Sequence, residues 1–388
     1  MLTTRRLFVL LAGVAVLLLG TALWAGLRQR DKGVALARLV ALPTEQAGFA
    51  RADGPKDLVF PADRGSHPDY QTEWWYYTGN LQTANALHYG YQLTFFRRAL
   101  LPPQEQSPRE SKWAASQVYM AHFAISNVPD RRFRAFERVS RGSVGLAGAA
   151  GEPYHVWLEN WSVEEVESGV VHLHAEQDDL FLDLTLTDRK GVVLEGDRGY
   201  SQKGAEPGNA SYYYSQTRLE TVGTLQVGGR KDEVTGLSWM DHEFSTSSLA
   251  PGQVGWDWFA LQMDDGSELM VYQIRRKDGS ADPSSSGTLV APDGTARHLT
   301  RDDFRIGLTN QWRSPHSGAN YPARWTVEVP VASLTLRIEP YLADQELNLS
   351  YSYWEGAVHF TGEHAGLAVS GDGYVELTGY AGTMQGQF

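Results

Sequence analysis

The chain has 388 residues, a length that the usual domain size predicts to form about two domains. It carries 46 acidic and 34 basic side chains, and the resulting net charge of −12 argues against nucleic acid or an anionic membrane surface as its main partner. Because it has no cysteine, disulfides, thiolate zinc sites and cysteine nucleophiles are excluded.

The sequence pattern of residues 1–25 predicts an export signal. Arg5 and Arg6 precede an apolar run over residues 7–19, which is the order of charged and apolar regions in such signals. The stretch around the two arginines also resembles a twin-arginine signal. The apolar segment is close to the length that spans a membrane, so an uncleaved anchor is the alternative. In both cases we expect a periplasmic or secreted protein that contacts the membrane only through this segment, followed by a linker over residues 26–66.

From residue 73 onward, almost every segment has the pattern of a β-strand. Residues 118–126 and 170–175, for example, alternate side chains between two faces, and short turns separate one such segment from the next. Regular strands without intervening amphipathic helices predict an all-β sandwich or barrel. We place one β-domain at residues 67–230 and a second at residues 231–388.

Two aromatic hairpins, one in each half, carry the clearest pattern. The first begins with residues 73–81 (EWWYYTGNL), and the second begins with residues 255–262 (GWDWFALQ) and turns at an Asp-Gly pair. A gapless overlay places Trp75 on Trp256 and Tyr77 on Trp258, so we interpret the hairpins as copies of one structural unit. Alternation puts each of these pairs on equivalent strand faces. Their aromatic side chains either line a pocket or fill the cores.

Motifs from both halves together resemble a known family. They are HPDYQTEWWYYTGNL (67–81), GLSWMDHEFS (236–245), GWDWFALQMDDGSELMVYQIR (255–275), YWEGAV (353–358) and GYVELTGY (373–380). In this order they resemble the AttH and carotenoid 1,2-hydratase family. The resemblance implies two lipocalin-like (calycin) antiparallel β-barrel domains and possible ABC transporter components as partners. It also implies a hydrophobic ligand such as a lipid, isoprenoid or polyene.

Asp241, His242 and Glu243 place three titratable groups inside one aromatic strand, and we predict them as catalytic residues. If Asp241 or Glu243 points into an apolar cavity, desolvation raises its pKa and keeps a proton available for donation to an alkene. Water would then complete a hydration. The alternative is that the triplet forms ion pairs with arginines at the interface between the domains.

Aromatic and polar side chains that face inward are expected to bind the ligand inside the barrels. The predicted ligand-binding residues are Glu73, Trp75, Tyr77, His122, Trp239, Trp256, Trp258, Tyr272, Gln273 and Trp354. For His122, a hydrogen-bonded structural histidine is the alternative. Gln273 marks a departure from the hydratases, because the resemblance implies an acid on this strand and an amide cannot act as a general acid.

No cofactor and no metal site are expected. His172 and His174 share one strand face, but the sequence offers no evident third ligand, so a surface strand is favoured. Hydrolase motifs are absent, because residues 236–240 lack the final glycine of a nucleophile elbow. Two functions stay open: an exported protein that binds a hydrophobic small molecule without turnover, and a carotenoid 1,2-hydratase-like hydro-lyase.

Overall fold

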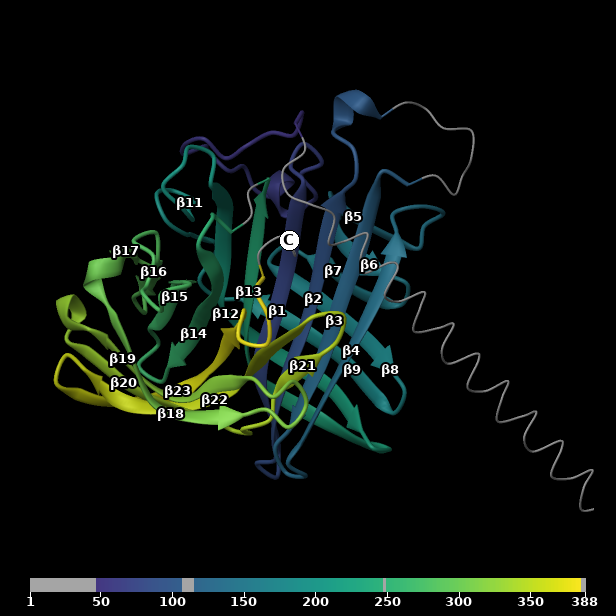
Figure 1. Cartoon of the computed structure of the whole chain (residues 1–388). Coiled ribbons are helices and arrows are strands. Elements are labelled where there is room, and N and C mark those ends of the chain that lie inside the picture. Colours follow the sequence, from purple (N-terminus) through teal and green to yellow (C-terminus); the bar gives the residue numbers. More distant parts are fainter. Residues whose placement is uncertain (1–46, 107–114, 247–248, 385–388) are drawn as a thin grey trace, which may run out of the picture.

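The structure is a computed structural model that describes residues 47–106, 115–246 and 249–384. In this part of the chain, two antiparallel β-sheets account for the architecture (Figure 1). The prediction of an all-β protein with two lipocalin-like units is confirmed. The predicted export signal and residues 26–46 of the predicted linker lie outside the described residues. No helix in the described ranges is long and apolar enough to cross a membrane.

The first sheet curls into a nearly closed barrel. Its strand order is β4-β3-β2-β1-β13-β12-β9-β8-β7-β6-β5, and the two ends of this order approach each other through β4 and β6. Its strands are β1 (Thr72–Thr83), β2 (His88–Ala99), β3 (Gln117–Asn127), β4 (Arg132–Arg141), β5 (Ala147–Gly151), β6 (Tyr154–Leu158), β7 (Trp161–Glu167), β8 (Val170–Gln177), β9 (Leu180–Asp188), β10 (Val193–Leu194), β11 (Tyr200–Gln202), β12 (Ala210–Val227) and β13 (Arg230–Ser245).

The second sheet is a half-barrel in the order β17-β16-β15-β14-β23-β22-β20-β19-β18, with β21 paired to β22. Its strands are β14 (Gln253–Met263), β15 (Glu268–Arg276), β16 (Ser286–Val290), β17 (Ala296–Thr300), β18 (Arg305–Arg313), β19 (Asn320–Val329), β20 (Leu334–Pro340), β21 (Glu346–Asn348), β22 (Ser352–His364) and β23 (Leu367–Leu377). Four 3-10 helices occur at Ala62–Arg64 (η1), Pro103–Glu105 (η2), Arg301–Asp303 (η3) and Pro330–Ala332 (η4).

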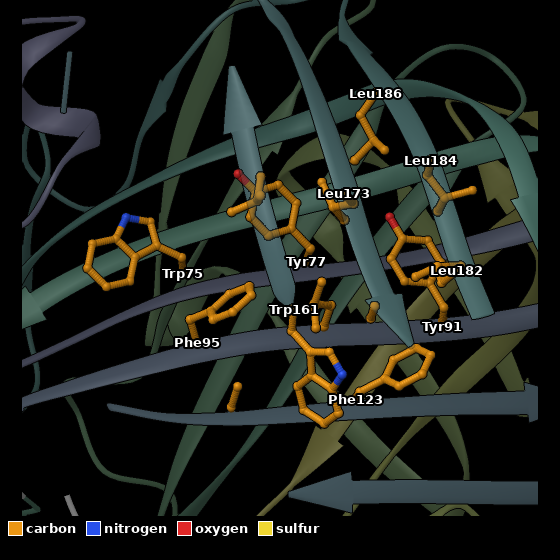
Figure 2. Packing of buried hydrophobic residues seen from close by; sticks show 14 of the residues in the cluster. Trp75, Tyr77, Tyr91, Phe95, Phe123, Trp161, Leu173, Leu182, Leu184 and Leu186 are labelled. Carbon is orange, nitrogen blue, oxygen red and sulfur yellow. The ribbon is translucent and has the colours of Figure 1, made fainter. Parts of the chain in front are cut away.

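The barrel interior of the first sheet is filled by its own side chains. Trp75, Tyr77, Tyr91 and Phe95 point inward from β1 and β2 and pack against leucines of β8 and β9 and against Trp161 (Figure 2). The void left beside this cluster is only about 10 Å³. The expected hollow inside the first barrel is therefore not present, since aromatic rings occupy the space that a ligand would need.

The second sheet has two buried faces. One face carries its own core, which includes Phe259, Leu261 and Trp354. The opposite face of β14, β15, β22 and β23 packs against the outside of the first barrel, where Tyr76, Tyr213 and Trp239 meet side chains of the second sheet. The two units thus share a buried interface between their sheets.

Strand β13 belongs to the first sheet, where it pairs with β1 and β12. The predicted boundary near residue 230 assigns these residues to the second unit, whereas the change of sheet occurs between Ser245 and Gln253. Most of the motif that contains Asp241 is therefore a wall of the first unit.

The strand pairing in the structure does not agree with the gapless overlay of the two hairpins. Trp75 pairs with Phe95, whereas Trp256 pairs with Ile274. The gapless overlay would place Phe95 on Arg276, so it does not preserve the pairing, and a shift of one residue is needed. Such a shift turns every side chain to the other face. Trp75 accordingly faces the first core, while Trp256 faces the interface.

Candidate functional site

A cavity of about 140 Å³ lies at the interface between the two sheets. For comparison, an engineered apolar cavity of about 150 Å³ is large enough to bind benzene. Strands β1, β12 and β13 form the wall from the first unit, and β14, β15, β22 and β23 form the wall from the second. The side chains that carry the following description are Trp74, Tyr76, Lys203, Tyr213, Asp241, Glu243, Trp256, Trp258, Tyr272, Tyr353, Glu355 and Glu376.

Strand register places an aromatic ring beside each carboxylate of the first wall. Tyr76 of β1 lies opposite Asp241 of β13, and Trp74 lies opposite Glu243. Because side chains alternate along a strand, these four residues share the outward face while the residues between them point into the barrel. The site is therefore built from the face of β1 that the barrel core does not use.

Asp241 is the most strongly hydrogen-bonded acid of the cavity. Its Oδ1 accepts hydrogen bonds from Ser215 Oγ at 2.6 Å and Trp239 Nε1 at 2.7 Å, and its Oδ2 accepts one from Tyr213 Oη at 2.6 Å. Burial raises the pKa of Asp241 to about 6, although these hydrogen bonds act in the opposite direction. A carboxyl with this pKa can accept or release a proton near neutral pH.

Glu243 forms an ion pair with a partly buried lysine. Lys203 Nζ lies 3.1 Å from Glu243 Oε1 and 4.3 Å from the centre of the Tyr272 ring. Burial alone would lower the pKa of Lys203, but Glu243 and Tyr272 outweigh this effect and the pKa is raised. Lys203 therefore stays charged and compensates Glu243.

Glu355 and Glu376 form a pair of carboxyls on the opposite wall. They face each other directly across β22 and β23; Glu355 is buried and Glu376 is partly buried. Burial raises the pKa of Glu376 to about 7, although Trp256 Nε1 donates a hydrogen bond to it at 2.8 Å. Burial, together with the charge of Glu376, raises the pKa of Glu355 well above its usual value.

Within the described residues, neither carboxyl oxygen of Glu355 accepts a hydrogen bond of ordinary geometry. The hydroxyls of Tyr76 and Tyr353 lie near enough to lower its pKa in part, but less than burial raises it. Glu355 is therefore a neutral acid that points into a largely aromatic cavity.

His242 points away from this cavity, into the first barrel. Its Nε2 lies 2.8 Å from Glu73 Oε1, and Arg97 Nε donates to Glu73 Oε2 at 2.7 Å. His67 Nδ1 also lies 2.7 Å from Glu73, so two imidazoles and one carboxylate come within 4.8 Å of one another, as metal ligands can. The buried Arg97 already neutralises Glu73 and occupies one of its oxygens, so this arrangement fits a structural ion-pair network rather than a metal site.

The chain matches the AttH-like family over residues 51–380. It belongs to the AttH-like family. The resemblance seen in the motifs is thereby confirmed. A crystal structure assigned to AttH of Nitrosomonas europaea is 35% identical, covers 86% of this chain and 100% of its own, and superposes with a TM-score of 0.76.

Two more distant relatives also match this AttH-like chain. Kievitone hydratase from Nectria haematococca has the same fold, with 15% identity, a TM-score of 0.64, and coverage of 88% of this chain and 98% of its own. The dehydratase asqC of Emericella nidulans is 24% identical over 207 residues, which are 50% of this chain. The match spans only 57% of the length of that dehydratase.

Five of the predicted residues of the AttH-like chain line the cavity, and a sixth lies beside it. The lining residues are Asp241, Glu243, Trp256, Trp258 and Tyr272. Trp239 packs in the interface and donates to Asp241.

His122 lies at the edge of the same interface, where its Nδ1 is 2.8 Å from Tyr353 Oη and its Nε2 is 3.2 Å from Glu137. These contacts agree with the alternative interpretation of His122 as a hydrogen-bonded structural histidine. Tyr353, whose hydroxyl contacts His122, lines the cavity. His122 can therefore orient Tyr353 without reaching the ligand itself.

Other predicted residues of the AttH-like chain point elsewhere. Trp75 and Tyr77 belong to the packed barrel core together with the His242 and Glu73 network, and Trp354 belongs to the core of the second sheet. Gln273 is the neighbour of Tyr272 on β15 and therefore lies on the opposite face, where it pairs with Asp257. None of these side chains lines the cavity.

Seven of the side chains that shape the site were not predicted as site residues: Trp74, Tyr76, Lys203, Tyr213, Tyr353, Glu355 and Glu376. A signal for the two glutamates was present, because each follows a core residue (Trp354, Val375) within a short apolar stretch of its strand (residues 353–358 and 373–377). Lys203 lies in a loop whose composition predicts only a linker, and only the tertiary fold brings it to Glu243.

Proposed function

We propose that this AttH-like protein is a hydro-lyase that adds water to, or removes water from, a hydrophobic small molecule bound in the cavity between the sheets. The observation that carries this proposal is a division of roles between two buried carboxyls on opposite walls. Glu355 is kept neutral by its surroundings, whereas Asp241 is held by three hydrogen-bond donors. Environments that push the pKa values of two carboxyls apart provide an acid and a base in one site.

The chemistry follows from these two states. In the dehydration direction, Glu355 donates its proton to the departing hydroxyl, which leaves as water, and Asp241 accepts the proton from the neighbouring carbon. The electron pair of the broken C–H bond forms the alkene. In the hydration direction the same groups exchange roles: protonated Asp241 adds its proton to the alkene carbon, and the carboxylate of Glu355 removes a proton from the attacking water. General acid and base groups typically contribute about 100- to 10,000-fold each to such steps.

The aromatic walls support the same proposal. Protonation of an alkene, or loss of water from an alcohol, develops positive charge on carbon, and the faces of Trp and Tyr rings stabilise cations. Trp256, Trp258 and Tyr213 line the same cavity as the two acids. The name of the dehydratase relative, asqC, agrees with this reaction class.

The decisive variant is Glu355→Gln, which keeps the size of the side chain but cannot donate an acidic proton. The purified full-length chain is incubated in ¹⁸O-labelled water with a fractionated extract of hydrophobic metabolites, and products are followed by mass spectrometry. We expect the wild type to change one metabolite by the mass of one water and Glu355→Gln to reduce that rate about 100-fold or more.

Glu363→Gln is the matched control, because Glu363 lies on the same strand β22 but away from the cavity. The control variant should react at the wild-type rate. Equal rates for Glu355→Gln and the wild type would remove Glu355 from the mechanism. A wild type that changes no metabolite would contradict the hydro-lyase proposal itself.

Binding without turnover is the second candidate, and the aromatic lining of the cavity favours it as well. In this proposal the protein is exported, holds a lipid, isoprenoid or polyene in the same cavity, and transfers it to ABC transporter components. Mass spectrometry of an organic extract of the purified protein should then identify a co-purifying ligand that Trp258→Ala fails to retain. Recovery of the protein from the cytoplasmic fraction would contradict the export part.

A further inference from the structure

Another carboxyl lies behind Asp241 and does not line the cavity. Glu195 follows β10, and its Oε1 lies 3.0 Å from the hydroxyl of Ser215 on β12, whose oxygen is 2.6 Å from Asp241 Oδ1. The exposed fractions of Glu195, Ser215 and Asp241 are 1%, 0% and 4%. One serine hydroxyl therefore bridges two buried carboxyls.

The hydrogen-bonding capacity of the Ser215 hydroxyl determines how many protons the two carboxyls share. A serine hydroxyl has a single proton and can donate to only one acceptor at a time. If both carboxyls were ionised, one of the two short contacts of Ser215 would bring two electron-rich oxygens together without a proton. One carboxyl must therefore carry a proton and donate it to Ser215 Oγ, which then donates its own proton to the other.

The surroundings decide which carboxyl carries the proton. Asp241 accepts hydrogen bonds from Tyr213 and Trp239 besides Ser215, and these donors stabilise a negative charge. Glu195 has the Thr288 hydroxyl as its other partner. Burial and the charge of Asp241 raise the pKa of Glu195 to about 8, although the hydrogen bonds with Thr288 and Ser215 and the charge of Lys203 act in the opposite direction. Glu243 acts in the other direction by raising the pKa of Asp241, but its effect is smaller than that of each of the three hydrogen bonds.

We propose that Glu195 is a buried proton store for the cavity and exchanges its proton with Asp241 through the hydroxyl of Ser215. In this step Glu195 gives its proton to Ser215 Oγ while Ser215 gives its own proton to Asp241 Oδ1. Glu195 becomes a carboxylate, Asp241 becomes a carboxylic acid, and the serine hydroxyl is restored. Glu195 is a positioning residue, since it reaches the ligand only through Asp241.

This exchange deepens the proposed hydro-lyase activity but is tested without it. In a hydro-lyase, Asp241 must return to its starting protonation state after each turnover, and a buried carboxyl one hydroxyl away can take up or supply that proton. A purely structural role is the competing explanation, because Thr288 belongs to β16 and its contact with Glu195 ties the second sheet to the first.

The experiment is isotope-edited infrared spectroscopy of the full chain labelled with ¹³C at glutamate carboxyls, which separates protonated from ionised groups. At pH 7, the difference between wild type and Glu195→Gln should contain the band of one protonated glutamic acid per chain. The substituted side chain keeps both hydrogen bonds, because an amide can donate to Ser215 and accept from Thr288. A difference that contains a carboxylate band instead would overturn the proposal.

Ser215→Ala tests the bridge while leaving both carboxyls in place. We expect the protonated band of Glu195 to remain but to shift, because its proton has lost its acceptor. Ser211→Ala is the matched control, since Ser211 is a buried serine of the same strand whose hydroxyl has no hydrogen-bond partner among the described residues. An unshifted band in Ser215→Ala would show that Glu195 does not donate to Ser215 and would contradict the exchange.

Discussion

Two buried glutamates of this protein are in opposite charge states. Glu73 is ionised because Arg97 and two imidazoles surround it, and its pKa is held well below its usual value even though burial acts in the opposite direction. Glu355 has no such counter-charge and stays neutral. The first arrangement stabilises the barrel, while the second supplies acidity to the cavity.

Arg97→Met should reduce the free energy of unfolding by about 3–5 kcal/mol, because it leaves Glu73 buried without its cation. Arg97 also donates to the backbone carbonyls of His67 and Tyr70, so the variant loses two further hydrogen bonds. Urea unfolding measures the loss. The control Arg305→Met removes a solvent-exposed partner of Glu328 and should leave stability unchanged. Equal stability of both variants would contradict the assigned role of Arg97.

Glu195→Gln should stabilise the protein at alkaline pH. The pKa of Glu195 is about 8 in the folded chain against 4.5 ordinarily, so between these values the unfolded chain has lost a proton that the folded chain retains. The wild type therefore loses stability as pH rises from about 4.5 to 8, by up to about 5 kcal/mol at about 1.4 kcal/mol per pKa unit.

The variant lacks this dependence, so its advantage over the wild type should be absent near pH 4.5 and largest near pH 8. Urea unfolding at the two pH values measures it. A constant difference between the two proteins at both pH values would mean that Glu195 ionises in the folded chain as it does in solution.

At the scale of the single strand, β1 shows what the sequence could and could not predict. Its β-conformation, its hairpin with β2 and its aromatic burial were predictable from alternation. The sequence did not predict which face of β1 points into the core and which points into the cavity. Residues 74–77 are all aromatic, so alternation cannot distinguish the two faces. Trp75 and Tyr77 consequently were predicted as ligand contacts, while Trp74 and Tyr76 occupy that place.

The site was predictable only in part, where a titratable or aromatic residue stands out within a strand, as Trp256, Trp258 and Tyr272 do. Asp241 and Glu243 were found in this way. Lys203 and Glu195 each follow a very short strand, and their partners are distant in the sequence, so no local pattern indicates them. Burial of a carboxyl depends on the packing of the other sheet, which a single strand does not encode.

Gly79 of β1 is required by the packing of its neighbours. A Cβ at this position would lie 2.5 Å from the Tyr91 ring and 2.6 Å from Ser238 Oγ, so the hydrogen bond between these two residues would be disturbed. Gly79→Ala should therefore cost about 1–3 kcal/mol of stability in thermal or urea unfolding. Gly307→Ala on β18 has room for the methyl group and serves as the control. If Gly79→Ala were as stable as the control, the barrel would be less tightly packed than described.

At the scale of the whole molecule, the site depends on the two sheets staying in place against each other. Buried polar contacts hold this arrangement beside the aromatic cluster. The amide of Gln262 donates to the backbone carbonyls of Thr217 and Ser238, and Asn80 donates to that of Gly373. Because such contacts have directions, they fix one relative position of the sheets rather than a range of positions.

Glu268→Gln should weaken this interface, because Glu268 is the shared counter-charge of Lys190 and Arg218 from the first unit. Removal of one member of a buried ion cluster leaves the other charges uncompensated. Differential scanning calorimetry should show the second sheet unfolding at a lower temperature than the first, as a separate transition. Glu220→Gln, which removes the exposed partner of Arg189, should unfold as the wild type does. A single unchanged transition in Glu268→Gln would contradict this role of the cluster.

The division of β1 into two faces has a practical consequence for protein engineering. Trp75 and Tyr77 must be preserved for the chain to fold, but Trp74 and Tyr76 are free to vary as far as the barrel is concerned. A combinatorial library restricted to the outward residues of β1 and the facing residues of β14 would reshape what the protein accepts while leaving the barrel core intact. Directed evolution toward new substrates can therefore start from a handful of alternate positions.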